Sequence, residues 1–280
     1  VDSSGDLSGS DGDASWDMSG SSGEDLLSTS GQLYITDVDA GEGTFAARTS
    51  ADPVVGLYGS LAIDTSGAWT YTLDNAAANV QGLGDGDTRT DTLVVQTADG
   101  TTQDISITIM GTNDAPVITG VVSASLSEDV SVDASGNLVA SGQLSITDVD
   151  TDEASFQAGA LSGTYGSLDI DASGAWTYTV DNARSDVQSL SAGDALTDTI
   201  HVQSVDGTMQ DITITIDGTN DVPVVTGSVS ASLSEDAVDI YGNLVASGQL
   251  LITDADAGES SFQAGALSGT YGSLDIDASG

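Results

Sequence analysis

Apolar and polar residues alternate along several short segments of the chain. Residues 69–73, 105–109 and 212–216 place Trp, Tyr, Leu or Ile at every second position, with Thr or Ser between them. A period of two residues is typical of β-strands with one buried and one exposed face. Only residues 75–83 and 182–190 could form a turn or two of helix, because Thr, Val, Ile and Gly outnumber good helix formers elsewhere. The pattern predicts a chain that is almost entirely β.

Turn residues separate these segments at regular intervals. Asp-Gly pairs at 99–100 and 206–207 lie between alternating runs and fit two-residue hairpin turns. Ser-Gly pairs at 66–67 and 173–174 join a shorter strand to the Trp-containing one. About seven short strands in each stretch of about 107 residues, with a turn signal every 8–12 residues, are typical of a sandwich. We therefore expect an all-β fold of antiparallel β-sandwich domains of the immunoglobulin-like kind.

The chain repeats itself in tandem. GAWTYTLDN at 67–75 returns as GAWTYTVDN at 174–182, and GTNDAP at 111–116 returns as GTNDVP at 218–223. The period of about 107 residues matches one small domain, so each copy should have its own core. Four extra residues near 51–54 in the first copy indicate a surface loop. We expect a linker or the end of a preceding repeat at 1–20, followed by sandwich repeats at 21–115, 116–222 and 223–280.

The third copy stops half-way. Residues 261–280 reproduce 155–174 in sequence, and the chain ends at the turn before the next Trp-containing strand. Half a sandwich would expose its inner face and an edge strand. The ordinary interpretation is truncation, with the remainder present in the native protein. The alternative is strand complementation, in which neighbouring protomers supply the missing strands and form a filament.

Charge excludes several classes of function. The chain has 44 Asp and Glu residues against three Arg and no Lys, which gives a formal net charge of −41. Nucleic acids and anionic membrane surfaces are bound by Lys and Arg, so neither is an expected partner. No run approaches the length of a membrane span, so direct membrane insertion is not expected. With no Cys the domains cannot use disulfides, and metal ions are the obvious stabiliser for so acidic a chain.

Acidic residues gather at three places in each copy. These are the Ser-Glu-Asp near the start, the Asp-x-Asp that ends the SGQL strand, and the Asn-Asp that closes the copy. Carboxylates held close together repel unless a hard cation neutralises them, and Ca²⁺ takes six to eight oxygen ligands. We expect them to meet at the junctions between copies, near Asn113 and Asp114 before Pro116, whose fixed φ stiffens the exit from the last strand.

Other interpretations of these residues stay open at this point. Short acids also fill turns, because they tolerate left-handed backbone and cap their own chain. Glu42, Glu153 and Glu259 fit solvated strand ends. Trp69 and Trp176 lie on the apolar face of a strand and are expected in the core, the alternative being a platform for stacking sugars. Paired carboxylates could serve a glycosidase, but the same acids recur in every copy and no nucleophile motif appears, so we do not expect an enzyme.

The motifs together resemble known extracellular repeats. GTNDAP, a later Asp-x-Asp and an early acidic pair resemble the calcium-binding signatures of cadherin repeats. SGQLxITDxDxGE, YGSLxID, GAWTYTLDN and GTNDAP are more closely similar to the VCBS repeat of bacterial RTX-type adhesins, over nearly all of residues 24–280. The resemblance implies cadherin-like or immunoglobulin-like modules in a very large secreted protein, with Ca²⁺ binding that rigidifies the array.

The resemblance also implies two sets of calcium ligands. The first set is Glu24, Asp25, Asn113, Asp114, Asp148 and Asp150, and the second is Glu128, Asp129, Asn220, Asp221, Asp254 and Asp256. It implies extender repeats of a secreted or cell-surface bacterial adhesin that support adhesion and biofilm formation, with neighbouring repeats of the same chain as partners. A glycan- or protein-binding sandwich module is the competing function.

Overall fold

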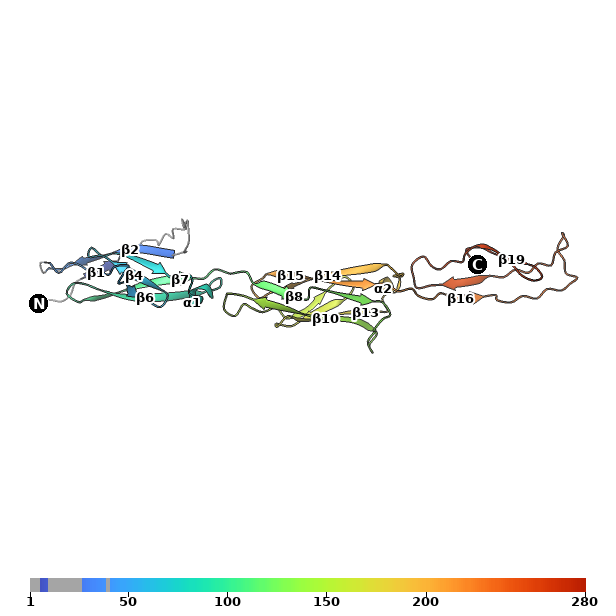
Figure 1. The fold of residues 1–280 in the computed structure, drawn as a ribbon, viewed down its shortest axis with the longest axis horizontal. Coiled ribbons are helices and arrows are strands. Elements are labelled where there is room, and N and C mark those ends of the chain that lie inside the picture. Colours follow the sequence, from blue (N-terminus) through green and yellow to red (C-terminus); the bar gives the residue numbers. More distant parts are fainter. Residues whose placement is uncertain (1–5, 10–26, 39–40) are drawn as a thin grey trace. The chain divides into compact units, whose positions relative to one another are not determined.

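The chain is almost entirely β, as the alternation predicts. The computed structural model describes residues 6–9, 27–38 and 41–280 (Figure 1). In these residues the helices are single turns, α1 (Ala78–Gln81) and α2 (Ser185–Gln188), inside the two segments expected to form them. By its internal contacts the chain divides into two compact units, Val1–Val117 with Thr147–Ala154, and Ile118–Ile146 with Ser155–Gly280. None of the helices in the described part is long and apolar enough to cross a membrane.

The first repeat contains two sheets around one core. One sheet has the order β1-β2-β5-β4-β3, and the other is the hairpin of β6 and β7. Their inward positions fill a core that includes Phe45, Leu61, Tyr71, Leu93 and Ile107. The strands are β1 (Asp6–Gly9), β2 (Leu27–Thr36), β3 (Val54–Val55), β4 (Gly59–Ile63), β5 (Ala68–Leu73), β6 (Thr88–Gln96) and β7 (Thr102–Met110).

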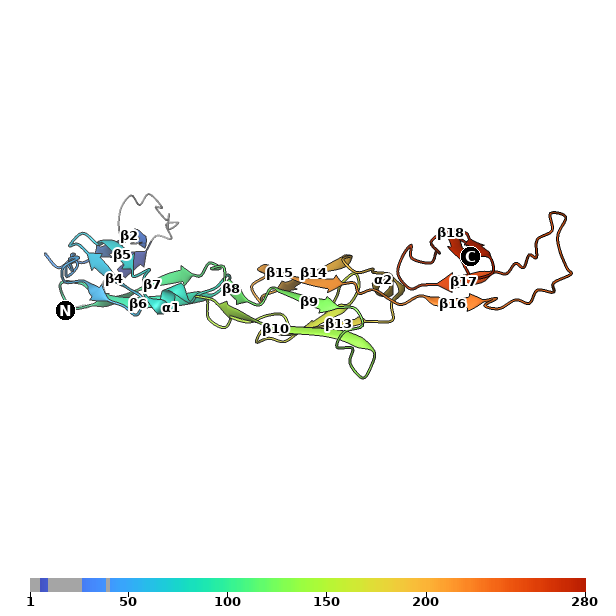
Figure 2. The ribbon, with the colours of Figure 1, turned by 45° about the vertical axis from the view of Figure 1, so that its right-hand side comes forward.

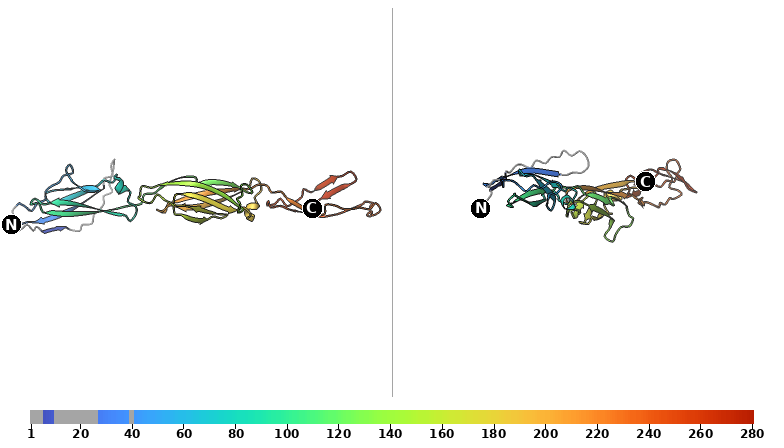
Figure 3. Two further views of the ribbon diagram at one scale, coloured as in Figure 1. Left: turned by 90° about the horizontal axis from the view of Figure 1, so that it is seen from below. Right: turned by 60° about the vertical axis from the view of Figure 1, so that its left-hand side comes forward.

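The second repeat is a two-layer sandwich of the same design. One layer has the order β11-β12-β13-β10-β8 and the other β14-β15-β9. Figure 2 shows β9, β14 and β15 on one side and β10 and β13 on the other, and the strands run lengthwise along the repeat (Figure 3). The strands are β8 (Val117–Gly120), β9 (Ser123–Ser127), β10 (Asn137–Thr147), β11 (Gly159–Ser162), β12 (Ser167–Ile170), β13 (Ala175–Asp181), β14 (Ala195–Gln203) and β15 (Met209–Asp217). These layers confirm the predicted sandwich, of the immunoglobulin- and cadherin-like class.

One strand pair within the sandwich is parallel. β9 pairs with β15 in the register Ser123 to Thr213 through Ser127 to Asp217. The pairing continues one residue further, where Glu128 N donates to the carbonyl oxygen of Asp217 at 2.9 Å. The early acidic pair therefore lies at the end of the last strand of the same repeat.

A buried carboxylate joins the two layers in each of the first two repeats. Asp198 of β14 is 1% exposed, and it accepts hydrogen bonds from Tyr178 Oη of β13 (2.9 Å) and from the backbone N–H groups of Thr164 (2.8 Å) and Tyr165 (3.0 Å). Burial raises its pKa, but these hydrogen bonds outweigh burial and hold the pKa below its usual value of 3.8. Asp91 and Tyr71 repeat the contact in the first copy, at 2.8 Å. The chain has no Cys, so hydrogen bonds link the layers where a disulfide could have done so.

The Asp-Gly hairpins are longer than predicted. Thr97 N donates to Thr101 O at 2.9 Å, so three residues lie inside the closing pair, not two. Gly100 has φ +95° and Gly207 has φ +98°, the left-handed conformation of the third loop position. The expectation of two-residue turns was wrong because the left-handed Gly is a third loop residue, which forms a β-bulge after the turn.

The two Trp residues differ in burial. Trp176 is fully buried, as predicted, and its Nε1 donates to Val121 O at 3.0 Å. Trp69 packs against the first core but is only half-buried. Val121 directly follows β8, whereas residue 10, which follows β1, lies outside the described residues.

Residues 223–280 form two antiparallel sheets of two strands each. β16 (Val224–Gly227) pairs with β17 (Leu250–Thr253), and β18 (Gly265–Ser268) pairs with β19 (Ser273–Ile276). Most side chains here are exposed, and Tyr271 is 101% exposed where Tyr165 of the second repeat is half-buried. The apolar positions of this half repeat are therefore uncovered.

Candidate calcium sites

The second acidic site, which we define as Glu128, Asp129, Asp221, Asp254 and Asp256, lies within one of the two units. Glu128 is 0% exposed, although it ends an edge strand. Its Oε2 accepts a long hydrogen bond from Thr219 N (3.4 Å), and its Oε1 is buried with no hydrogen-bond partner. A buried carboxylate oxygen without a donor is costly unless a cation contacts it.

Two further carboxylates lie beside Glu128. One oxygen each from Glu128, Asp129 and Asp221 lie within 4.8 Å of one another. Asp129 has φ +57°, and its Oδ1 accepts hydrogen bonds from Asn182 Nδ2 (2.6 Å) and Gln188 Nε2 (3.0 Å). Sequence reasoning missed Asn182 and Gln188, although Asn182 closes the recurrent WTYTVDN motif.

The Asp-x-Asp that follows β17 completes this site. Asp256 is 2% exposed, and its Oδ2 accepts a hydrogen bond from Asp221 N at 2.9 Å. Asp254 Oδ1 accepts one from Asp256 N at 3.0 Å. The remaining buried oxygens, Asp254 Oδ2, Asp256 Oδ1 and Asp221 Oδ2, have no hydrogen-bond partner. Four of the predicted ligands, Glu128, Asp221, Asp254 and Asp256, thus each have a buried oxygen without a hydrogen-bond partner.

The electrostatics of the site follow from this crowding. Burial raises the pKa of Glu128 to about 7, and the charges of Asp129, Asp221 and Asp256 act in the same direction. Burial and the neighbouring Asp129, Asp256 and Asp254 raise the pKa of Asp221 as well. The hydrogen bonds from Asn182 and Gln188 lower the pKa of Asp129. The raised pKa values of Glu128 and Asp221 show that burial disfavours their charged forms and that these neighbouring carboxylates repel one another. A hard divalent cation would relieve this repulsion and contact the unsatisfied oxygens.

The first acidic site, Asp114, Asp148 and Asp150, repeats the same contacts in the other unit. Asp150 is 3% exposed, and its Oδ2 accepts a hydrogen bond from Asp114 N at 2.7 Å. Asp148 Oδ1 accepts one from Asp150 N at 2.9 Å, and Asp148 Oδ2 and Asp150 Oδ1 have no hydrogen-bond partner. The predicted ligands Glu24 and Asp25 lie outside the described residues.

The Asp-x-Asp loops that begin at Asp148 and Asp254 also contact the helical turn of the preceding repeat. Thr151 N donates to Gly82 O (3.2 Å), and Ala257 N donates to Ser189 O (3.2 Å). Gly82 and Ser189 directly follow α1 and α2, where backbone carbonyls lack partners inside the helix. The loops are therefore held beside the residues that close the preceding copy.

The Asn residues predicted as ligands, and the Glu residues predicted as strand ends, differ from the buried Asp residues in exposure. Asn113 and Asn220 are exposed, and their side-chain amides donate to the carbonyl oxygens of Asp114 (2.9 Å) and Asp221 (2.6 Å). Glu42 and Glu259 are exposed, as expected of strand ends. Glu153 is half-buried beside Asp150, so its assignment as a solvated strand end was wrong.

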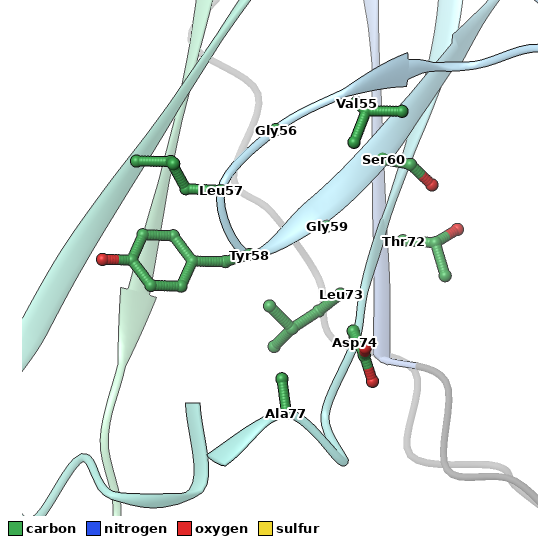
Figure 4. A pocket seen from close by; sticks show the side chains of 10 residues that line it. All are labelled: Val55, Gly56, Leu57, Tyr58, Gly59, Ser60, Thr72, Leu73, Asp74 and Ala77. Atoms are coloured by element: carbon green, nitrogen blue, oxygen red, sulfur yellow. The ribbon is translucent and has the colours of Figure 1, made fainter. Parts of the chain in front are cut away.

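An open hollow of about 350 Å³ lies elsewhere in the first repeat, between the β3–β4 loop and the end of β5. Leu57 and Tyr58 extend to the same side of the loop, and Leu73, Asp74 and Ala77 line the opposite wall (Figure 4). The acidic sites are not part of it.

Comparisons with solved structures found distant likenesses. The extracellular domains 1–4 of protocadherin gamma B7 are 16% identical, with 94% of this chain and 64% of that chain covered and a TM-score of 0.38. A Ca²⁺-stabilised adhesin that helps an Antarctic bacterium bind ice is 13% identical, with 91% and 60% covered and a TM-score of 0.21. A 1.5-MDa bacterial ice-binding adhesin is 17% identical, with 70% and 58% covered and a TM-score of 0.23. The chain thus spans less than two thirds of each of these structures.

The chain was also compared with sequence families and with curated proteins. None of the curated proteins compared with the chain matches it. Residues 113–218, which cover most of the second repeat, match the family of bacterial cadherin-like domains.

Proposed function

We propose that the chain is a segment of the extender region of a secreted bacterial surface adhesin, and that Ca²⁺ stiffens the joints between its repeats. The observation that carries this proposal is the set of buried carboxylate oxygens without hydrogen-bond partners in the second acidic site, on Glu128, Asp221 and Asp256. The tandem repeats, the bacterial cadherin-like match at 113–218 and the net charge of −41 support it. The role is structural and not catalytic.

The residues of the site would couple one repeat to the next. The second repeat contributes Glu128, Asp129 and Asp221. The next repeat contributes Asp254 and Asp256, which follow β17, the strand that pairs with β16. Bound Ca²⁺ would supply the positive charge and the six to eight coordination positions that these oxygens lack. Without it, the like charges repel and favour separation of the Asp-x-Asp loop from the preceding repeat.

Small-angle scattering of the whole chain in Ca²⁺ and then in EGTA tests the proposal. We expect a larger maximum dimension and a narrower spread of conformations in Ca²⁺. The double variant D150N/D256N should lose this response, whereas D169N/D275N, which removes the same charge from exposed positions, should keep it. Equal dimensions of the unaltered chain in Ca²⁺ and EGTA would overturn the proposal.

A further inference from the structure

The two Asp-x-Asp loops share a backbone but not a side-chain arrangement. Glu153 N approaches Asp150 O at 3.5 Å, and Glu259 N approaches Asp256 O at 3.4 Å, so both loops make the same turn. The residue before each Glu is left-handed, Asp152 with φ +67° and Gly258 with φ +88°. Yet Glu153 is half-buried and Glu259 is exposed.

The difference in exposure coincides with a glycine in the preceding repeat. A Cβ on Gly84 would lie 2.3 Å from Glu153 Oε1, and the same point is 3.7 Å from the Cβ of Asp150. Glu153 therefore occupies the space that a side chain at residue 84 would need. The equivalent of Gly84 in the next copy is Ser191, in the LSAGD that replaces LGDGD. The second joint therefore has a side chain at the position where the first has none.

The position of Glu153 adds a carboxylate to the first acidic site. A Cβ on Gly84 would lie within 4 Å of both Glu153 Oε1 and Asp150 Cβ, so the two side chains share one region. Asp150 is 3% exposed, and its Oδ1 has no hydrogen-bond partner. Carboxylates gathered in one region repel one another, and a bound cation would offset that repulsion. Adding ligand charge raises the affinity of an oxygen site for Ca²⁺.

We infer that Glu153 supplies a further oxygen ligand at the first joint, admitted by Gly84, and that the second joint lacks this ligand because Ser191 excludes Glu259. The inference rests on the proposed function. The joints then differ in their number of carboxylate ligands. The residue at position 84 or its equivalent decides whether a joint has the additional carboxylate.

Calorimetric titration of the whole chain with Ca²⁺ tests the inference, in a D256N background so that the first joint dominates the signal. We expect E153Q and G84S each to weaken binding about tenfold, which corresponds to about 1.4 kcal/mol. The matched control E259Q should bind as the D256N parent does. Unchanged affinity in E153Q would overturn the inference while leaving the proposed function in place.

Thermal unfolding in EGTA separates a ligand role from a purely structural one. If Glu153 is a ligand, E153Q should be as stable as the parent or more stable without metal, because the substitution removes repulsion from Asp150. A loss of metal-free stability in E153Q would show a structural role and overturn the inference. If the unaltered chain binds no Ca²⁺, the proposed function fails first and this inference fails with it.

Discussion

At the scale of single residues, Glu128 makes the stability of the metal-free folded state depend on pH. Its side chain is fully buried, and burial together with three neighbouring carboxylates raises its pKa from 4.5 to about 7. The folded state therefore binds a proton that the unfolded state has already released above pH 4.5. Because of this difference, the metal-free folded state loses stability as the pH rises from about 4.5 through 7.

We predict that E128Q removes this loss. In EGTA at pH 8, E128Q should unfold at a higher temperature than the unaltered chain, and the difference should disappear near pH 4. In Ca²⁺ the order should reverse, because the variant has lost a charged ligand. E235Q, at the exposed equivalent position of the third copy, is the control and should change neither curve. The same pH dependence in E128Q and in the parent would contradict the assignment.

At the scale of elements, the parallel strand β9 positions Glu128, the residue that directly follows it. The hydrogen bonds at its two ends are Thr213 N to Val122 O (3.0 Å) and Glu128 N to Asp217 O (2.9 Å). Backbone groups on a strand alternate in direction, so the N–H of Ala124 points to β15 and that of Ser125 points away. The pairing of β9 with β15 places Glu128 beside Thr219.

A proline scan of β9 tests this positioning role. A124P should remove one hydrogen bond of the ladder, lower the melting temperature of the second repeat by about 5–10 °C and weaken Ca²⁺ binding at the second acidic site. S125P should be tolerated, because the N–H that it removes faces away from β15. Differential scanning calorimetry with and without Ca²⁺ measures both effects. Equal responses of the two variants would show that β9 does not position the site.

At the scale of the whole molecule, the proposed binding unit crosses the repeat boundary. Glu128 and Asp221 lie within residues 116–222, but Asp254 and Asp256 lie beyond them. The loop that contains Asp148 and Asp150 also associates with the repeat before it. Its contacts place Thr147–Ala154 in the same compact unit as Val1–Val117. A single repeat therefore carries an incomplete set of carboxylates at each end.

Fragments that end on either side of the loop test this division. The fragment 113–257 should be stabilised by about 2.7 kcal/mol at a Ca²⁺ concentration 100 times its dissociation constant, whereas the fragment 113–222 should respond weakly. The longer fragment carrying D254N/D256N is the matched control and should behave like the shorter one. A calcium-induced rise in melting temperature of equal size in all three would show that the ligands lie inside one repeat.

Much of the fold could be predicted from the sequence because strand alternation and turn residues are local signals. The period of two placed Trp176, Tyr178 and Val180 on one buried face, as observed. The same alternation indicates the hydrogen-bonded link between the layers, because Asp198 shares the inward face of β14 with Ile200 and Val202. A carboxylate in phase with buried residues must find donors inside the sandwich.

Less of the candidate sites than of the fold could be predicted from the sequence. The sequence by itself determined which residue types recur, Glu-Asp, Asp-x-Asp and Asn-Asp, and that they fall near the ends of the copies. Only the tertiary structure decided that Glu128 is buried, that Asn220 is exposed, and that Glu153 but not Glu259 turns inward. The physical reason is that burial of these side chains depends on residues about 35 to 90 positions away, as in the contacts of Asp221 with Asp256 and of Thr219 with Glu128. Local patterning carries no information about such contacts until the chain has folded.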